Sequence, residues 1–252
     1  KGLSARIRRL NEELLHLRPP ASGNPDHDEY KAGSDTAESA SDNTELSDIL
    51  FPEGHKKYGK KVPEEYEAYL FNKPAKCPVC GHGFNALMPR MSKLKLDRID
   101  NDFRKHHVDF DTLWYNIWVC PKCYYSSFNY DFNNPISPRL AKAVQEKLEE
   151  LKNTTTIEFK DPLTIDQVFT SYYLALYCAK AANANPLKIG KLWLQLSWLY
   201  RDLKDERMAK TAALNALEYY HDAFYNSKLD ISPEEEQQCC IVLAELYIIK
   251  GD

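Results

Sequence analysis

The spacing of apolar residues changes along the chain and divides it into a β part and a helical part. From residue 136 onwards, apolar residues recur at steps of three and four, which is typical of amphipathic helices. The segment 114–120, WYNIWVC, alternates instead and predicts a strand, and residues 84–97 predict one or two more. We therefore expect an α+β protein in which a small zinc-ribbon-like β module precedes antiparallel helical hairpins.

Helices are predicted at 137–152, 164–182, 187–202, 204–227 and 232–250. Thr164 and Gln167 fit a capping box, and Ser232 with Glu235 gives the clearest start signal. The joins between these helices are short, so neighbouring helices should form antiparallel hairpins. A shorter helix is predicted at 63–72, before the β module.

The N-terminal part of the chain has two distinct segments. Residues 3–17 predict an amphipathic helix, with a stripe of Leu3, Ile7, Leu10, Leu14 and Leu17. Residues 19–55 hold nine acidic residues and one base, Lys31, and predict a flexible acidic linker because they bury too little apolar surface to offset their ordering entropy. The expected domains are the N-terminal helix 1–18, the linker 19–55, a zinc-binding module 56–135 and a helical repeat-like domain 136–252.

The last helices also match the tetratricopeptide frame, in which small residues let paired helices approach and large ones fill the groove between hairpins. The matching positions are Trp193, Leu196, Ser197, Tyr200, Ala209 and Ala216, with a partial second frame at Leu243, Ala244, Tyr247 and Gly251. An ordinary helical bundle with the same aromatic residues in its core is the alternative. Because the chain stops in the turn of a repeat, Leu243, Leu246 and Tyr247 should need cover from a further helix or another chain.

Four of the seven cysteines form two C-P-x-C pairs, Cys77 with Cys80 and Cys120 with Cys123. This spacing places two thiolates on one tight turn, and two such turns complete a tetrahedral four-thiolate site without an open coordination position. The sequence therefore predicts one structural zinc ion. Redox chemistry at a C-x-x-C pair, two disulfides, an iron–sulfur cluster and a ligand exchange with His82 are the alternatives.

The segments CPVCGHGF (77–84), SKLKLDRIDNDF (92–103) and LWYNIWVCPKCYYSSF (113–128) resemble the bacterial family called domain of unknown function 2225. The resemblance continues through 188–205 and 212–224 and covers about 70–252. Tyr124 stands where the family usually has Gly, and Ser126 where it often has Ala, which leaves the cysteines intact but puts the turn after the second pair in doubt. The resemblance implies an architecture and no activity.

An enzyme is one alternative function, because Asp100, Asp102 and His106 could bind a second metal or act in acid–base chemistry, with Asp97 and His107 nearby. Asp100 and Asp102 would share one face of a strand. The alternative is that both aspartates cap turns or pair with Arg98, Arg104 and Lys105. The segment contains no nucleophile elbow, phosphate loop or H-E-x-x-H pattern.

A nucleic-acid-binding zinc ribbon is a second alternative, because residues 73–123 hold nine bases and five acids. Candidate residues for base stacking are Tyr115, Tyr124, Tyr125 and Phe128. The formal net charge of −4 and the pI of about 6.0 argue against a chain that binds nucleic acid over its whole surface.

The composition points to a reduced, cytoplasmic protein without a membrane segment. No apolar run approaches the roughly 20 residues that span a bilayer, and no signal peptide opens the chain. We expect a protein partner for the helical domain. An isolated helix as short as residues 3–17 is marginal in water, so we expect it to pack against a partner, a second copy or an upstream domain, with a frayed terminal helix as the alternative. The chain begins at Lys1 and not at Met, which fits a start further upstream. A non-enzymatic protein-interaction scaffold is the leading hypothesis.

Overall fold

The computed structural model describes residues 49–154, 156–159, 162–226 and 231–251. The predicted helix at 3–17 and the acidic linker up to residue 48 lie outside the described residues. The described residues belong to one compact unit. Within the described part of the chain, no helix has the length and apolar character that crossing a membrane requires.

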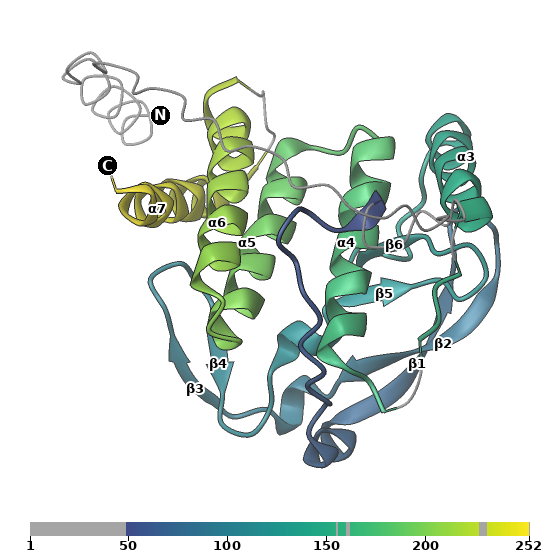
Figure 1. The fold of residues 1–252 in the computed structure, drawn as a ribbon, viewed down its shortest axis with the longest axis horizontal. Helices are drawn as coiled ribbons and strands as arrows, with labels where there is room; N and C mark the ends of the chain where they lie inside the picture. The colour runs from purple at the N-terminus through teal and green to yellow at the C-terminus, as the bar shows by residue number, and fades with distance from the viewer. Residues whose placement is uncertain (1–48, 155, 160–161, 227–230, 252) are drawn as a thin grey trace, which may run out of the picture. The chain divides into compact units, whose positions relative to one another are not determined.

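The β module consists of three antiparallel strand pairs (Figure 1). These are β1 (Leu70–Lys76) with β2 (Gly83–Pro89), β3 (Leu96–Ile99) with β4 (Lys105–His107), and β5 (Ile117–Val119) with β6 (Ser126–Phe128). The strands predicted within 84–97 and 114–120 are confirmed, although β5 is short because the 3-10 helix η3 (Thr112–Tyr115) takes up the start of its segment.

The short helix predicted at 63–72 is only partly correct. Residues Glu64–Tyr69 form a 3-10 helix, η1, but the backbone from Leu70 onwards is extended. Leu70 pairs with Pro89 and Phe71 with Met88, so hydrogen bonding to β2 replaces helical bonding in the last part of this segment.

The predicted helices of the second part are confirmed, with α4, α5 and α6 lying side by side (Figure 1). They are α3 (Pro138–Thr154), α4 (Ile165–Ala181), α5 (Pro186–Asp202), α6 (Glu206–His221), which continues into the π-helix η4 (Asp222–Asn226), and α7 (Pro233–Lys250). Both predicted capping boxes are present. Thr164 and Gln167 form one at the start of α4, and Ser232 and Glu235 form the other at the start of α7. The four-residue join before α5 and the three-residue join before α6 are short, as antiparallel neighbours require.

Helix α4 joins the β module to the helices. It packs against β5, β6 and η3 as well as against α3 and α5, and most of its residues are buried. Tyr172 on α4 is fully buried and donates its hydroxyl hydrogen to the carbonyl of Leu113 (3.1 Å) or to Gln195 Oε1 (2.7 Å). The module and the helices therefore share one core.

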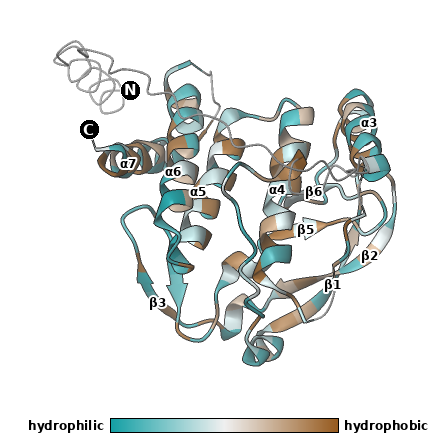
Figure 2. Cartoon of the chain, in the orientation of Figure 1, coloured by the Kyte–Doolittle hydropathy of each residue, from teal (hydrophilic) through white to brown (hydrophobic). Residues whose placement is uncertain are grey.

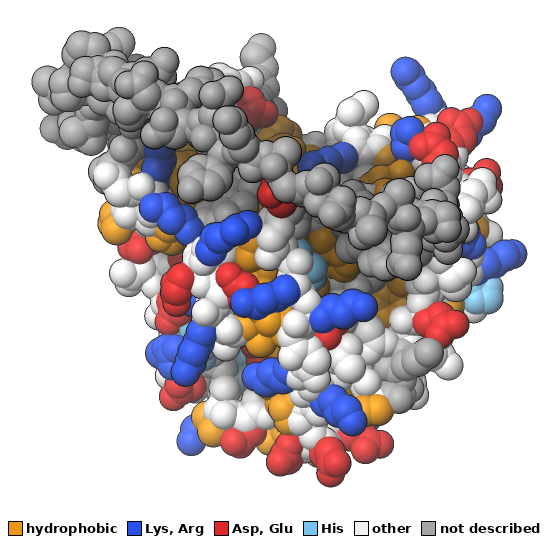
Figure 3. All heavy atoms as spheres, viewed as in Figure 1, with side chains coloured by type: hydrophobic (Ala, Val, Ile, Leu, Met, Phe, Trp, Pro, Cys, Tyr) orange, Lys and Arg blue, Asp and Glu red, His pale blue; other side chains and the backbone are white. Residues whose placement is uncertain are grey.

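Residues 50–62, here called the strap, lie across α4 and α5. Leu50 is buried, Phe51 stacks on His55, and the His55 ring approaches Tyr200 with 2.7 Å between Nδ1 and the hydroxyl oxygen. The end of the segment predicted to be a flexible linker, residues 49–55, is thus packed on helices, because its apolar and aromatic side chains find an aromatic surface there. On the face drawn in Figure 3, basic side chains gather along the strap with acidic ones among them.

The burial of the tetratricopeptide positions is compatible with that frame and equally with an ordinary helical bundle. Trp193, Leu196, Tyr200, Ala209 and Ala216 are buried between α5 and its neighbours. We expected a further helix or another chain to cover Leu243, Leu246 and Tyr247, and this expectation is wrong for the first two residues. Leu243 and Leu246 are already buried, because they face α6 and η4, and only Tyr247 is half-buried.

Candidate metal centre

Two equivalent turns present the four cysteines. In the first, the Gly81 amide donates to the carbonyl of Cys77 and the Cys77 amide donates to the carbonyl of His82, both at 2.9 Å. In the second, the Tyr124 and Cys120 amides make the matching bonds to Cys120 and Tyr125, also at 2.9 Å. The residue after the second cysteine has positive φ in both turns, 71° at Gly81 and 64° at Tyr124. The chain thus builds the same knuckle twice.

Tyr124 shows how the second turn accommodates a residue other than glycine. A left-handed backbone costs a non-glycine residue roughly 1–2 kcal/mol. The Tyr124 side chain gains contacts in return: its hydroxyl oxygen accepts from the Ile157 amide (3.3 Å), and Lys152 Nζ lies 4.9 Å from its ring centroid. The departure from glycine therefore leaves the geometry of the knuckle intact.

The four sulfur atoms lie within 4.8 Å of one another. The Sγ atoms of Cys77 and Cys123 are 3.5 Å apart, and those of Cys80 and Cys120 are 3.7 Å apart. Four thiolates at the zinc–sulfur distance of about 2.3 Å in a tetrahedron have sulfur–sulfur separations of about 3.8 Å. The arrangement fits a tetrahedral metal ion, and the structure forms no disulfide from these cysteines.

The ionisation of the cluster is uneven in the absence of a cation. Hydrogen bonds from Cys123 and Cys77 lower the pKa of Cys120, whereas bonding to Cys120 raises the pKa of Cys123 and of Cys77. One thiolate is stabilised by the neighbouring S–H groups, but a second negative charge beside it is not. A bound cation removes this conflict, because it stabilises all four thiolates together.

The cluster is held by an aromatic core. Cys77 and Cys120 are buried, and Cys80 is half-buried. Below the knuckles, Phe132 is fully buried with its ring centroid 5.3–5.9 Å from those of Phe84, Trp118 and Tyr125. The two turns therefore stand on a packed base that joins β2, β5 and the chain after each knuckle.

The alternative of a second metal at Asp100, Asp102 and His106 finds no support, because the structure does not bring these three side chains together as one group. Asp100 and Asp102 lie in the turn between β3 and β4, and not on one face of a strand. Asp100 accepts from His106 Nε2 (2.7 Å) and from Arg98, and these contacts lower its pKa against the opposing effect of burial. Among the described residues, the four cysteines form the only group of three or more Cys, His, Asp or Glu side chains suited to a metal ion.

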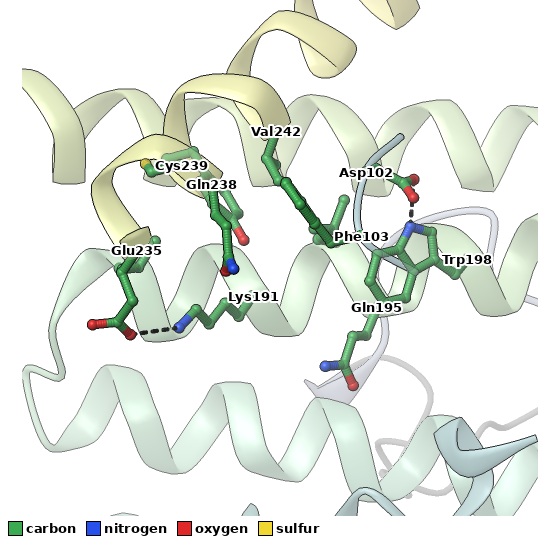
Figure 4. A pocket seen from close by; sticks show the side chains of 12 residues that line it. Asp102, Phe103, Lys191, Gln195, Trp198, Glu235, Gln238, Cys239 and Val242 are labelled. Carbon is green, nitrogen blue, oxygen red and sulfur yellow. Dashed lines mark hydrogen bonds and ion pairs between the residues drawn. The ribbon is translucent and has the colours of Figure 1, made fainter. Parts of the chain in front are cut away.

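Asp102 instead joins the β3–β4 turn to the helices (Figure 4). Its Oδ2 accepts from Trp198 Nε1 at 2.7 Å and from Arg201 at 3.2 Å. Next to it, Arg104 makes a two-pronged pair with Asp202, at 2.8 and 2.6 Å. Burial alone would lower the pKa of Arg104, but Asp202 raises it above the usual value. We call these residues, Asp102, Arg104, Trp198, Arg201 and Asp202, the latch.

Phe103 occupies a strained position at the tip of the same turn. Its φ is 64°, where glycine is the usual residue after a type I turn, and its amide donates to the carbonyl of Asp100 (2.9 Å). The ring lies beside Val242 and lines a cavity of about 150 Å³ between α5 and α7 (Figure 4). The strained backbone thus brings an apolar ring against the helices.

Sequence reasoning found the four cysteines and missed the helical half of the latch. Trp198 and Asp202 lie 96 and 98 residues from their partners.

Of the candidate stacking residues, Tyr115, Tyr125 and Phe128 are buried and unavailable to bases, and Tyr124 lies under Lys152.

A protein-family model matches residues 70–252. The family is described as "Uncharacterized protein conserved in bacteria (DUF2225)". The chain belongs to the DUF2225 family. This match covers both knuckles, the latch and helices α3 to α7, so the predicted family resemblance is confirmed.

An uncharacterised protein of Borreliella burgdorferi is 29% identical to this DUF2225 chain over 185 residues. The aligned part covers 67% of the chain and 66% of the relative, so the chain spans slightly less than two thirds of that protein. No solved structure matches.

Proposed function

We propose that this DUF2225 protein is a non-enzymatic protein-interaction scaffold stabilised by one structural zinc ion. Cys77, Cys80, Cys120 and Cys123 would hold the ion through their four sulfur atoms, and the observation that carries the proposal is the close approach of these atoms from two matching knuckles. Zinc would supply folding free energy to a module whose short strand pairs are marginal on their own.

Zinc is favoured over the alternative uses of these cysteines by the donor set. Four thiolates fill a tetrahedral site and leave no position for substrate, which is typical of structural zinc. A redox pair needs only two cysteines, and here both pairs contribute to one cluster. His82 is not part of the cluster and lies stacked near Phe84, so four cysteines are the simplest ligand set.

The scaffold part of the proposal is supported by the helices. Paired helices of this type present grooves and end faces to other proteins. The latch and α4 fasten the zinc module to those helices, so the metal would fix the position of the helical surface as well as the module itself.

The first test is the metal content of the purified, reduced protein and of two cysteine variants. We expect one zinc per chain in the natural sequence and in Cys240→Ser, which changes a half-buried thiol outside the cluster. Cys77→Ser should lose the zinc and most of the module's thermal stability. Retention of zinc and stability in Cys77→Ser would refute the structural site, and a second bound metal would reopen the enzyme hypothesis.

The scaffold is tested by capturing protein partners on the immobilised natural chain and on Cys77→Ser. A partner that binds the natural chain and Cys240→Ser, and is lost with Cys77→Ser, is the expected result. Salt-sensitive binding to nucleic acid without any protein partner would favour the nucleic-acid hypothesis instead.

A further inference from the structure

The strap lies on an aromatic surface that α4 and α5 form together (Figure 1). This surface consists of Phe169 and Tyr173 from α4 and Tyr200 from α5, all of which are buried. The ring centroid of Phe51 lies 5.2 Å from that of Tyr173, and the ring centroid of His55 lies 5.1 Å from that of Phe169. His55 Nδ1 also lies 2.7 Å from the Tyr200 hydroxyl oxygen. Two strap side chains thus fill this surface as anchor side chains fill a peptide-binding groove.

The two halves of the strap are attached to the helices in different ways. In residues 58–62, the backbone amides of Tyr58 and Gly59 donate to the carboxylate of Asp166 on α4, at 2.7 and 2.9 Å. Residues 50–57 are here called the arm. Among the residues that the structure describes, no backbone hydrogen bond joins the arm to a helix. The arm is therefore held on the helices by its side chains.

Most of the arm is hydrophilic (Figure 2), and one side of it faces water. Leu50 is buried, but Phe51 and His55 are only half-buried. Lys56 pairs with Asp205 at 3.1 Å, but the Lys56 side chain is 64% exposed, and such an ion pair contributes little to stability. A few anchor residues on an otherwise solvated segment are typical of a bound peptide.

Two glycines allow the path of the strap to change. Gly54 and Gly59 have φ angles of 88° and 64°, a conformation that glycine adopts without a steric cost. Gly59 lies two residues after the end of the arm, where the backbone-bonded half begins. Rotation at this position would release the arm from the helices while the rest of the strap keeps its bonds to α4.

We propose that the aromatic surface of α4 and α5 is a peptide-binding groove, and that the arm occupies it in competition with a segment of a partner protein. The partner segment is extended and carries an aromatic side chain followed, four residues later, by an imidazole or a second aromatic side chain, as Phe51 and His55 do. Because the arm is tethered, its effective concentration is roughly millimolar, and the partner must displace it. This inference deepens the proposed scaffold function and rests on it for the role of the groove.

The test is the binding of a fluorescein-labelled synthetic peptide, residues 49–57 of this sequence, to the full chain, measured by fluorescence anisotropy. In Phe51→Ser/His55→Ser the arm loses its anchors, so the peptide should bind at least about tenfold more tightly than to the natural chain. The matched control, Glu53→Ser/Lys57→Ser, changes two exposed residues of the same arm and should bind the peptide as weakly as the natural chain. A peptide with serine at both anchor positions should bind none of these proteins.

Helix content and zinc content are measured for each variant. If Phe51→Ser/His55→Ser does not fold, the milder Phe51→Ser repeats the measurement and should also bind the peptide more tightly than the natural chain. A folded variant that binds the peptide no better than the natural chain would overturn the proposal. Loss of helix content in both variants would also overturn it, because the arm would then be part of the core.

A dimer of the natural chain that forms with rising protein concentration, and is absent in Phe51→Ser/His55→Ser, would assign the groove to the arm of a second copy and overturn the proposal. The peptide measurement requires neither zinc nor an identified partner. Failure of this proposal is therefore distinguishable from failure of the zinc scaffold.

Discussion

At the scale of single residues, backbone conformation decides which side chains the knuckles tolerate. Gly81 and Tyr124 hold equivalent positions with positive φ, although one has no side chain and the other is aromatic. Tyr124 offsets its strain with the contacts of its ring and hydroxyl group. At Gly81 no atom lies within 4 Å of an added Cβ, so a side chain there would bring strain without a compensating contact.

Gly81→Ala should therefore destabilise the module by about 1 kcal/mol, because alanine disfavours the left-handed backbone. Gly83→Ala is the matched control: an added Cβ there also meets nothing within 4 Å, but the backbone is not left-handed. This variant should be neutral or slightly stabilising. Urea unfolding of the zinc-loaded proteins measures both, and equal effects of the two substitutions would contradict the argument.

His55 predicts a pH dependence of stability. Burial lowers its pKa from 6.5 to about 4, against the opposing charges of Asp166 and Asp205. The unfolded chain therefore binds more protons than the folded chain between about pH 6.5 and 4, and stability should fall as the pH falls through this window. Because His55 is partly exposed, we expect a loss of about 1–2 kcal/mol.

The measurement is urea unfolding at pH 7 and pH 5 for the natural chain and for His55→Gln. Protonation of the cysteines also lowers stability in acid, but it affects both proteins equally. The difference between them isolates His55. An identical pH dependence in the two proteins would show that His55 is not buried as a neutral side chain.

At the scale of elements, the close approach of α5 and α6 depends on a residue without a side chain. A Cβ at Gly190 would lie 2.8 Å from Tyr220 Cδ2 and 3.1 Å from Cε2. Tyr220 is buried, so its ring has little room to move. Gly190 thus sets the distance between α5 and α6.

Gly190→Ala should destabilise the protein by about 1–3 kcal/mol, because overpacking outweighs the gain in helix propensity. The double variant Gly190→Ala/Tyr220→Leu frees space beside the new methyl group. It should be more stable than the sum of the two single effects predicts. Thermal unfolding followed by far-UV circular dichroism measures the set, and strict additivity would show that the ring is not the obstacle.

At the scale of the whole molecule, the latch couples the β module to the helices. The Arg104 side chain is 6% exposed and pairs with Asp202, with Asp111 as a second acidic neighbour at 3.4 Å. A buried guanidinium that loses its partner keeps the cost of its desolvation. The exposed pair between Arg98 and Asp97, with 61% and 55% exposed side chains, lies in the same hairpin and provides a comparison.

Asp202→Ala should cost about 3 kcal/mol, whereas Asp97→Ala should cost less than about 1 kcal/mol. Arg104→Met/Asp202→Leu should recover part of the loss, since the buried guanidinium is gone, although Asp111 then keeps only the hydrogen bond from the Leu113 amide. Release of the proposed zinc ion and loss of helix content should occur together during urea unfolding of the natural chain, because the two parts share a core. Separate transitions would show that the latch does not couple them.

The local parts of this structure followed from the sequence. The spacing of the cysteines predicted the knuckles, and capping residues predicted the start of α4 and α7, because turns and helix ends depend on residues a few positions apart. The four-cysteine cluster itself was predictable once both turns were recognised, since two C-x-x-C pairs together supply the four ligands of one tetrahedral site.

The tertiary structure alone decided what the polar residues of the β3–β4 turn do. Asp100 and Asp102 have the composition of a metal site, but their partners determine their role: His106 and Arg98 for one, Trp198 and Arg201 for the other. The local sequence pattern also did not predict that the strap packs on α4 and α5. Contacts between residues about 100 positions apart depend on how the elements pack, and neither periodicity nor motif spacing encodes that.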